Sequence, residues 1–315
     1  MPEVALNGVR LHYQRVGRPE GETVVMLHGM LVDNLSSLYL TLAPVLVKDM
    51  DVVLYDQRGH GRSQRPATGY GVEQSVDDLT ALLDHLGING PVHLLGNSYG
   101  ALVAIETALS RPGLVASLVL IEAHFAVDGW GDHMAHDLEL AGFGLSEEDV
   151  QTWLGEFGGR KLNRLARKVE ALIKETSIIA DLRAARPLEA DALRGLDLPA
   201  LALYGEHSDA IARARDLEAL LPTCQLDLLA DCAHSALFEA TKTVRAIVGD
   251  WYAARRRGEP ARRETRRVEV GESEGEGAMH QEHVDFYKAE LERRMGAAAG
   301  ATNIRIAPRT AGRSA

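Results

Sequence analysis

The chain has 315 residues, of which 46% are hydrophobic, 25% charged and 5% aromatic. This composition is typical of a globular protein with a sizeable core and excludes a disordered or fibrous chain. The formal net charge of −11 argues against nucleic-acid binding as the main function, because an acidic body repels phosphate groups.

The sequence also bears on the compartment. Two cysteines, Cys224 and Cys232, are too few for a disulfide framework. The first 23 residues lack the basic start and apolar core of a secretory signal. There is no run of about 20 apolar residues that could span a bilayer. We therefore expect a cytoplasmic protein that acts away from membranes.

The predicted elements begin with a hairpin. Residues 4–6 and 9–13 flank Asn7-Gly8, a dipeptide typical of a tight type I′ turn. Short apolar runs rich in valine, leucine and isoleucine follow, which are typical of strands buried between helices in a parallel sheet. They lie at residues 24–28, 51–56, 92–97, 117–122 and 200–205.

Helical patterns alternate with these strands. Between residues 73 and 86, Val76, Leu79 and Leu82 form one apolar face, and Gly87 stands at a C-cap position. Alternation of strands and helices predicts an α/β fold with a mostly parallel, doubly wound sheet. The early hairpin would form an antiparallel edge.

The alternation stops between residues 124 and 198. Four helical segments are predicted there, at 132–141, 147–157, 161–176 and 178–185. We interpret 124–198 as a helical cap and residues 1–123 and 199–254 as the α/β core. Residues 255–315 are charged and low in complexity, and we expect a largely disordered tail with one helical segment near 280–295.

The strongest motif is Gly96-Asn97-Ser98-Tyr99-Gly100, which stands between a predicted strand and an apolar helix. Flanking glycines allow a strand to turn sharply into a helix and leave the hydroxyl of the central residue exposed. Ser98 is therefore the candidate nucleophile. The alternative is a serine that only caps the helix.

A serine hydroxyl needs a base, and the base needs an acid that orients it. Asp209 follows the strand predicted at 200–205, and His234 follows a further strand predicted at 225–230. We predict His234 as the base and Asp209 as the acid, with Glu206 as the second candidate acid. The other candidate bases are His28, His124, His133, His136 and His207.

Acyl transfer also requires N–H donors for the oxyanion of the tetrahedral intermediate. We expect the backbone N–H of Tyr99, which follows the nucleophile, to supply one donor. The loop after the strand at 24–28 would supply the second through Met30, with Gly29 allowing close approach of the backbone.

Together these motifs resemble the α/β-hydrolase superfamily over approximately residues 4–251. The resemblance rests on His28-Gly29, on the segment 56–63 (DQRGHGRS), on the turn at Ser98, and on Asp209 followed by His234. It implies an α/β-hydrolase fold with a helical cap and a Ser-Asp-His triad. Members often have glycine where this chain has Ala101 and Cys232, which leaves the subfamily open.

The resemblance leaves the substrate open, because the superfamily carries out many reactions on one scaffold. Several cap aromatics suggest an apolar pocket, although they would equally hold the cap helices together. The candidate pocket residues are His28, Asn97, Phe125, Trp130 and Trp153.

The helix predicted at 161–176, together with Arg160 just before it, has a basic face. Arg160, Lys161, Arg164, Arg167, Lys168 and Lys174 lie opposite an apolar stripe. Such a face could attract an anionic partner such as coenzyme A or an acyl carrier protein, or it could be a solvated helix face.

Three functions remain. The first is a serine esterase or thioesterase that forms an acyl-enzyme. The second is a C–C bond hydrolase acting on a β-diketone or vinylogous ketone, since Gly-Asn-Ser resembles the elbow of ring-cleavage-product hydrolases. The third is a non-catalytic binding member. None of them implies a cofactor or a metal.

Overall fold

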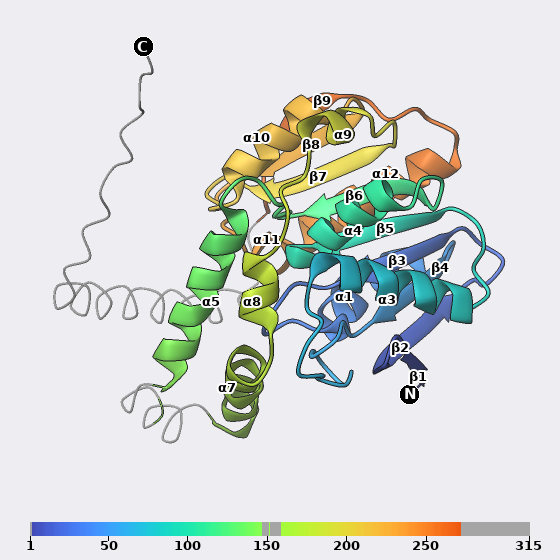
Figure 1. Ribbon diagram of the computed structural model, residues 1–315. Coiled ribbons are helices and arrows are strands. Elements are labelled where there is room, and N and C mark those ends of the chain that lie inside the picture. The colour runs from blue at the N-terminus through green and yellow to red at the C-terminus, as the bar shows by residue number, and fades with distance from the viewer. Residues whose placement is uncertain (1, 147–150, 152–158, 272–315) are drawn as a thin grey trace, which may run out of the picture. The chain divides into compact units, whose positions relative to one another are not determined.

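The computed structural model describes residues 2–146, 151 and 159–271. Their strands form one sheet in the order β1-β2-β4-β3-β5-β6-β7-β8-β9 (Figure 1). The pairs β1/β2 and β2/β4 are antiparallel, and every pair from β4/β3 onward is parallel. The predicted α/β fold with a mostly parallel sheet and an antiparallel edge is confirmed. The strands are β1 (Glu3–Leu6), β2 (Val9–Gly17), β3 (Thr23–Leu27), β4 (Asp51–Tyr55), β5 (Val92–Asn97), β6 (Val115–Ile121), β7 (Ala200–Gly205), β8 (Cys224–Leu229) and β9 (Glu264–Val268).

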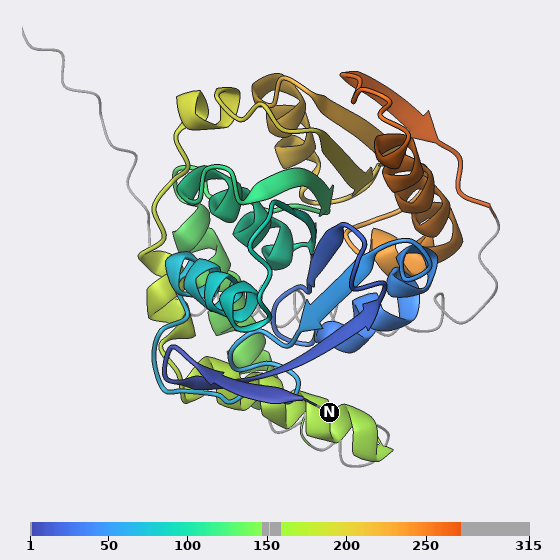
Figure 2. The same cartoon turned by 90° about the vertical axis from the view of Figure 1, so that its right-hand side faces the viewer.

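The hairpin at the start of the chain forms as predicted. Asn7 and Gly8 have φ angles of 49° and 74°, the left-handed conformation that a type I′ turn requires at both positions. Leu6 pairs with Val9 across the turn, and β2 continues along β4. Figure 2 follows the sheet from this blue hairpin to the orange β9.

The central strands are buried on both faces because each face of the sheet is covered by helices. In β3, Val25 and Leu27 belong to one buried cluster, and Val24 and Met26 belong to the other. The first cluster includes residues of α3, α4 and α10, and the second includes residues of α1, α2, α11 and α12. These helices are α1 (Leu35–Thr41), α2 (Ala43–Leu46), α3 (Val72–His85), α4 (Tyr99–Ser110), α10 (Ile211–Leu220), α11 (Ala236–Glu239) and α12 (Thr241–Arg256).

A helical insertion follows β6, as predicted. It contains α5 (Trp130–Ser146), α7 (Gly159–Lys174), α8 (Ile178–Arg183) and α9 (Ala190–Arg194). Figure 1 shows α5, α7 and α8 gathered beside one end of the strands. The helix predicted at 147–157 falls outside the described residues except for residue 151. No helix within the described ranges is long and apolar enough to cross a membrane.

The sheet and its helices continue past residue 254, where we placed the end of the core. Helix α12 runs to Arg256, and β9 adds a parallel strand beside β8. Two contacts explain why so charged a segment joins the sheet: Arg266 pairs with the fully buried Asp227, and Ala230 N donates to Val268 O. The helix expected near 280–295 lies outside the described residues.

Candidate active site

A sharp turn between β5 and α4 presents Ser98. Its backbone has φ 51° and ψ −115°, a conformation that side chains rarely adopt. A Cβ at Gly96 would lie 2.4 Å from Ala101 N, and one at Gly100 would lie 2.1 Å from Leu27 O. Only glycine at both flanks therefore lets helix and sheet approach closely enough to form the turn.

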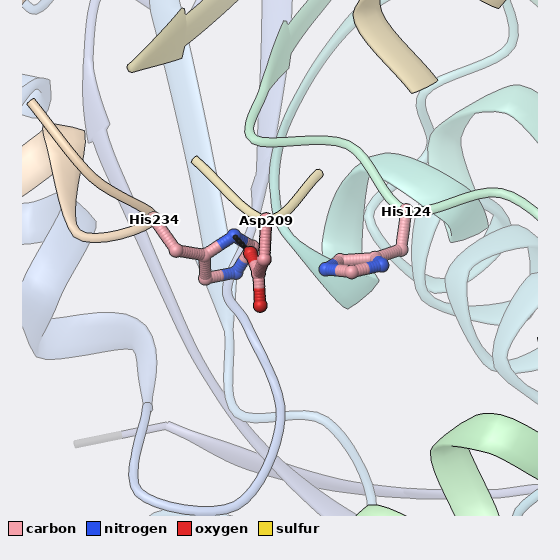
Figure 3. Close-up of side chains that lie close together, drawn as sticks. All are labelled: His124, Asp209 and His234. Carbon is pink, nitrogen blue, oxygen red and sulfur yellow. Dashed lines mark ion pairs between the residues drawn. The ribbon is translucent and has the colours of Figure 1, made fainter. Parts of the chain in front are cut away.

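The Ser98 hydroxyl meets an imidazole from a distant part of the chain. Ser98 Oγ lies 3.2 Å from Nε2 of His234, which stands in the loop after β8. On the other side of this ring, Nδ1 lies 3.2 Å from Asp209 Oδ1, in the loop after β7. Figure 3 shows the Asp209 carboxylate against the His234 ring. The structure thus brings together the three side chains predicted to react.

A second carboxylate reaches the same ring. Glu122 Oε2 lies 3.3 Å from His234 Nδ1, and the Glu122 side chain is fully buried, whereas that of Asp209 is 65% exposed. Neither carboxylate is aligned well enough with Nδ1 to form a linear hydrogen bond. His234 is therefore held by an ion pair that two acids share.

Glu122 is the residue that the sequence analysis missed. It directly follows β6, and it accepts hydrogen bonds of 2.5 Å from Gly205 N and from Ser208 Oγ. One signal could have revealed it: the apolar run at 117–122 ends in a carboxylate at the edge of the sheet where Ser98 was expected. A glutamate buried there requires a partner.

The two carboxylates determine the charge of His234. Burial by itself lowers the pKa of an imidazole, but the contacts with Asp209 and Glu122 outweigh burial and raise the pKa of His234 to about 9. The positively charged form of His234 is therefore stabilised. A base of this kind is strong but is largely protonated at neutral pH.

His124 is a neighbour of this group. Its ring centroid lies 5.0 Å from that of His234, and Figure 3 shows it directed toward Asp209 and His234. Burial, with repulsion from His234, lowers the pKa of His124 to about 4. It is therefore neutral at pH 7, unlike His234.

Two groups of described side chains have donors close enough to hold a metal ion. One comprises His124, Asp209 and His234, and the other Glu206, His207 and Asp231. In the first group, His234 also faces a serine hydroxyl. An acid–base role for His234 accounts for its contact with this hydroxyl, whereas a role as a metal ligand would not.

Gly29, in the loop expected to supply one oxyanion donor, lies beside Ser98. A Cβ at Gly29 would lie in ordinary contact with Ser98 Cβ, at 3.6 Å, and the Gly29 N–H donates to Asp33 Oδ2 at 2.7 Å. Tyr99 directly follows Ser98 as the first residue of α4. That its N–H and the N–H of Met30 hold an oxyanion stays a prediction.

The predicted pocket residues occupy different places. His28 is fully buried; its Nδ1 lies 2.6 Å from Gly29 O, and its Nε2 accepts from Gln57 N. Both ring nitrogens are satisfied, so His28 joins two loops and offers nothing to a substrate. Phe125 and Trp130 are also buried. Trp153 lies outside the described residues.

Asn97 remains close to the nucleophile. It is half-buried, and its Nδ2 donates to Asp33 Oδ2 over 3.4 Å. The same Asp33 oxygen accepts from Gly29 N, so the amide side chain is tied to the loop expected to stabilise the oxyanion.

The other candidate acid and bases have different partners. Glu206 pairs with Arg267 of β9 at 3.0 Å, and His207 lies 3.7 Å from Asp231. His133 is exposed and pairs with Asp137. None of these contacts involves Ser98.

A parallel sheet with a serine on a strained turn after one strand, and an imidazole at the same edge, is the arrangement of α/β hydrolases. Residues 22–241 match the sequence model of the family described as alpha/beta hydrolase fold. The chain belongs to this family.

Known relatives have several activities. The chain is 38% identical over 117 residues to a putative carbamate hydrolase, RutD, of Stutzerimonas stutzeri, a match to 36% of this chain and 43% of that protein. It is 37% identical over 121 residues to lipase LipV of Mycobacterium tuberculosis, covering 38% of this chain and 44% of that protein. The chain thus matches less than half the length of either relative.

A solved structure extends the similarity of fold. A variant of the meta-cleavage product hydrolase CumD of Pseudomonas fluorescens IP01, in complex with acetates, superposes with a TM-score of 0.60 at 22% identity. The match covers 81% of this chain and 98% of that one. At this identity the likeness concerns the fold alone.

Proposed function

We propose that this α/β hydrolase is a serine hydrolase that cleaves an acyl ester or thioester through an acyl-enzyme on Ser98. The observation that carries the proposal is the 3.2 Å contact between Ser98 Oγ and His234 Nε2, with two carboxylates on the opposite nitrogen of the ring. A nucleophile, a base and its orienting acid in contact form the minimum set for such catalysis.

The reaction has two halves. His234 takes the proton of Ser98 as Oγ attacks the carbonyl carbon, and the N–H groups of Met30 and Tyr99 hold the oxyanion. His234 then gives the proton to the departing alkoxide or thiolate. A water molecule, deprotonated by the same imidazole, then attacks the acyl carbon. The bond between this carbon and Ser98 Oγ breaks, Oγ takes the proton back from His234, and the acid is released.

We further propose that Glu122 and Asp209 act together on His234. Glu122 would stabilise the imidazolium more strongly, because a buried charge interacts through a lower effective dielectric than an exposed one. Asp209 would complete the orientation of the ring from the solvent side.

A C–C bond hydrolase is the second candidate. Asn97, next to the nucleophile, supports it, since its amide can donate to a ketone oxygen. Known relatives of the same fold include a meta-cleavage product hydrolase. Faster turnover of a dienol ketone than of simple esters would favour this candidate.

The test is a panel of p-nitrophenyl acyl esters, acyl thioesters and a dienol ketone, assayed with the wild type, Ser98→Ala and Ser110→Ala. We expect a burst of p-nitrophenol from the wild type. For Ser98→Ala we expect kcat to fall by a factor of at least about a thousand. Ser110, at the exposed end of the same helix, is the matched control and should keep full activity.

Hydrolysis unchanged in Ser98→Ala would contradict the mechanism. A fluorophosphonate probe tests the remaining candidate, a non-catalytic member. Labelling of Ser98 in the wild type supports an enzyme, and no labelling supports a binding protein.

A further inference from the structure

A hollow of about 670 Å³ lies on the cap, where helix α7 meets the loop after β4. We call it the basic hollow. Arginine and lysine make up most of its lining, and no described residue that lines it is acidic. The lining residues are Arg65, Gly159, Arg160, Asn163, Arg164, Arg167 and Lys168. On a chain of net charge −11, this is a local reversal of charge.

The packing of α7 directs these cations outward together. Ala166, Val169 and Leu172 are buried on one side of the helix, while Arg164 and Arg167 are exposed on the other. Residues spaced by three or four positions share a helix face, and like charges at that spacing repel each other. A cluster of this kind is stabilised when an anion binds.

Two hydrogen bonds to backbone carbonyls join α7 to the loop after β4. Lys168 Nζ donates to Gly61 O at 2.8 Å, and Arg65 Nη1 donates to Lys168 O at 3.1 Å. These contacts fix the cap helix to the loop after β4. Because the acceptors are neutral carbonyls, neither cation is neutralised by them.

The same loop reaches the candidate active site from its other side. His60 Nε2 accepts a hydrogen bond of 3.0 Å from the N–H of Leu31, the residue after Met30. The basic hollow and the loop expected to hold the oxyanion therefore share one supporting segment. A ligand in the hollow would therefore lie against a segment that also supports this loop.

We propose that the basic hollow binds the phosphate groups of a small organic polyphosphate, of the kind that carries an acyl thioester in coenzyme A. Guanidinium groups match phosphate oxygens in a bidentate manner, and several converging arginines suit more than one phosphate. The volume lies in the range of about 300–1,000 Å³ that small-molecule sites occupy. The thioester part of this inference rests on the proposed function.

The small extent of the basic hollow, one face of α7 and Arg65, favours a small molecule over an acidic protein. Stable protein interfaces take about 800 Å² from each partner and require an extended surface. Five cations line this one hollow instead, and so local a concentration of positive charge suits a pyrophosphate.

The experiment measures binding of coenzyme A and of inorganic pyrophosphate to the full chain by titration calorimetry at low salt. We compare the wild type with Arg164→Gln/Arg167→Gln. The matched control is Lys174→Gln/Arg194→Gln, which also removes two cations of the cap but from positions paired with Glu170 and Asp191. We expect one site in the wild type, at least tenfold weaker binding in the hollow variant, and a change below twofold in the control.

Kinetics separate this inference from the proposed function. Hydrolysis of the neutral p-nitrophenyl acetate should be equal in all three proteins, while KM for an acyl-coenzyme A should rise at least tenfold in the hollow variant alone. If neither probe binds the wild type, or if the control weakens binding equally, the inference is wrong. Binding of an acidic carrier protein without binding of pyrophosphate would also overturn it.

One further outcome concerns only the reaction. If both probes bind as expected but Ser98→Ala hydrolyses esters as fast as the wild type, the basic hollow stands and the proposed serine mechanism fails.

Discussion

At the residue scale, His234 is the centre of the site because three side chains contact its two ring nitrogens. Ser98 takes Nε2, and Asp209 and Glu122 share Nδ1. The two acids differ in environment: Glu122 is fully buried and held by two hydrogen bonds, while Asp209 is mostly exposed. Solvent screening weakens the exposed contact more than the buried one.

This difference predicts unequal effects of removing each charge. We expect Glu122→Gln to lower kcat/KM by at least about a hundredfold and Asp209→Asn by about tenfold, because the buried acid contributes more to the imidazolium. Steady-state kinetics on a neutral ester measure both, and circular dichroism checks that the variants fold. A larger loss for Asp209→Asn would show that the exposed acid dominates.

A second prediction concerns pH. His234 accepts the serine proton only when neutral, so with its pKa raised to about 9, kcat/KM of the wild type should increase with pH up to about 9. His124, with its pKa lowered to about 4, stays neutral over this range. Rates on a neutral ester from about pH 6 to about pH 10 test the profile, and a plateau beginning near pH 7 would contradict it.

The same profile distinguishes the role of Glu122 from a merely structural one. Loss of this negative charge lowers the pKa of His234, so the rise in kcat/KM of Glu122→Gln should shift to lower pH. A variant that only loosens the loop would lose activity without that shift.

At the scale of elements, the turn that presents Ser98 depends on the close approach of α4 to β3. A Cβ on Gly100 would overlap the carbonyl of Leu27, which is backbone and cannot rotate away. The position of the nucleophile is therefore set by helix packing as well as by the turn itself.

We predict that Gly100→Ala lowers the free energy of unfolding by about 2–4 kcal/mol, since α4 must move away from the sheet. The control is Gly249→Ala in α12, where nothing lies within 4 Å of the added Cβ. There alanine should stabilise by about 0.5–1 kcal/mol, because glycine loses more backbone freedom in a helix. Denaturant unfolding compares the two, and equal effects would contradict the packing argument.

At the scale of the whole described molecule, the sheet extends from the N-terminal hairpin to a ninth strand near residue 268. The Asp227 carboxylate, fully buried on β8, pairs with Arg266 of β9 and accepts a further hydrogen bond from Gln225. An unpaired buried carboxylate is costly, so this contact ties the last strand to the core.

Arg266→Gln should therefore lower the free energy of unfolding by about 1–3 kcal/mol. The effect is smaller than for a fully buried pair, because the Arg266 side chain is half exposed and Gln225 remains as a donor. The neighbouring Arg267→Gln removes an exposed pair with Glu206 and should change stability little. Thermal unfolding of both variants tests this, and a larger effect of Arg267→Gln would contradict it.

Local patterns alone determined much of this protein. The left-handed Asn7-Gly8 turn, the doubly buried strands, the helical insertion after β6 and the glycines around Ser98 all follow from side-chain periodicity and backbone sterics within a few neighbouring residues. The order of Ser98, Asp209 and His234 could be predicted for a related reason, since each follows a strand of one parallel sheet.

Only the tertiary structure decided the rest. Glu122 and Asp209 are 87 residues apart in the sequence. The residues around each of them do not indicate that both contact His234 or that Glu122 is fully buried. The charged segment at 264–268 becomes a strand because Asp227, buried on β8, needs a cation, and His28 becomes structural because Gly29 and Gln57 satisfy its ring. Burial and long-range pairing are properties of the folded chain, and they determine which of the polar residues can react.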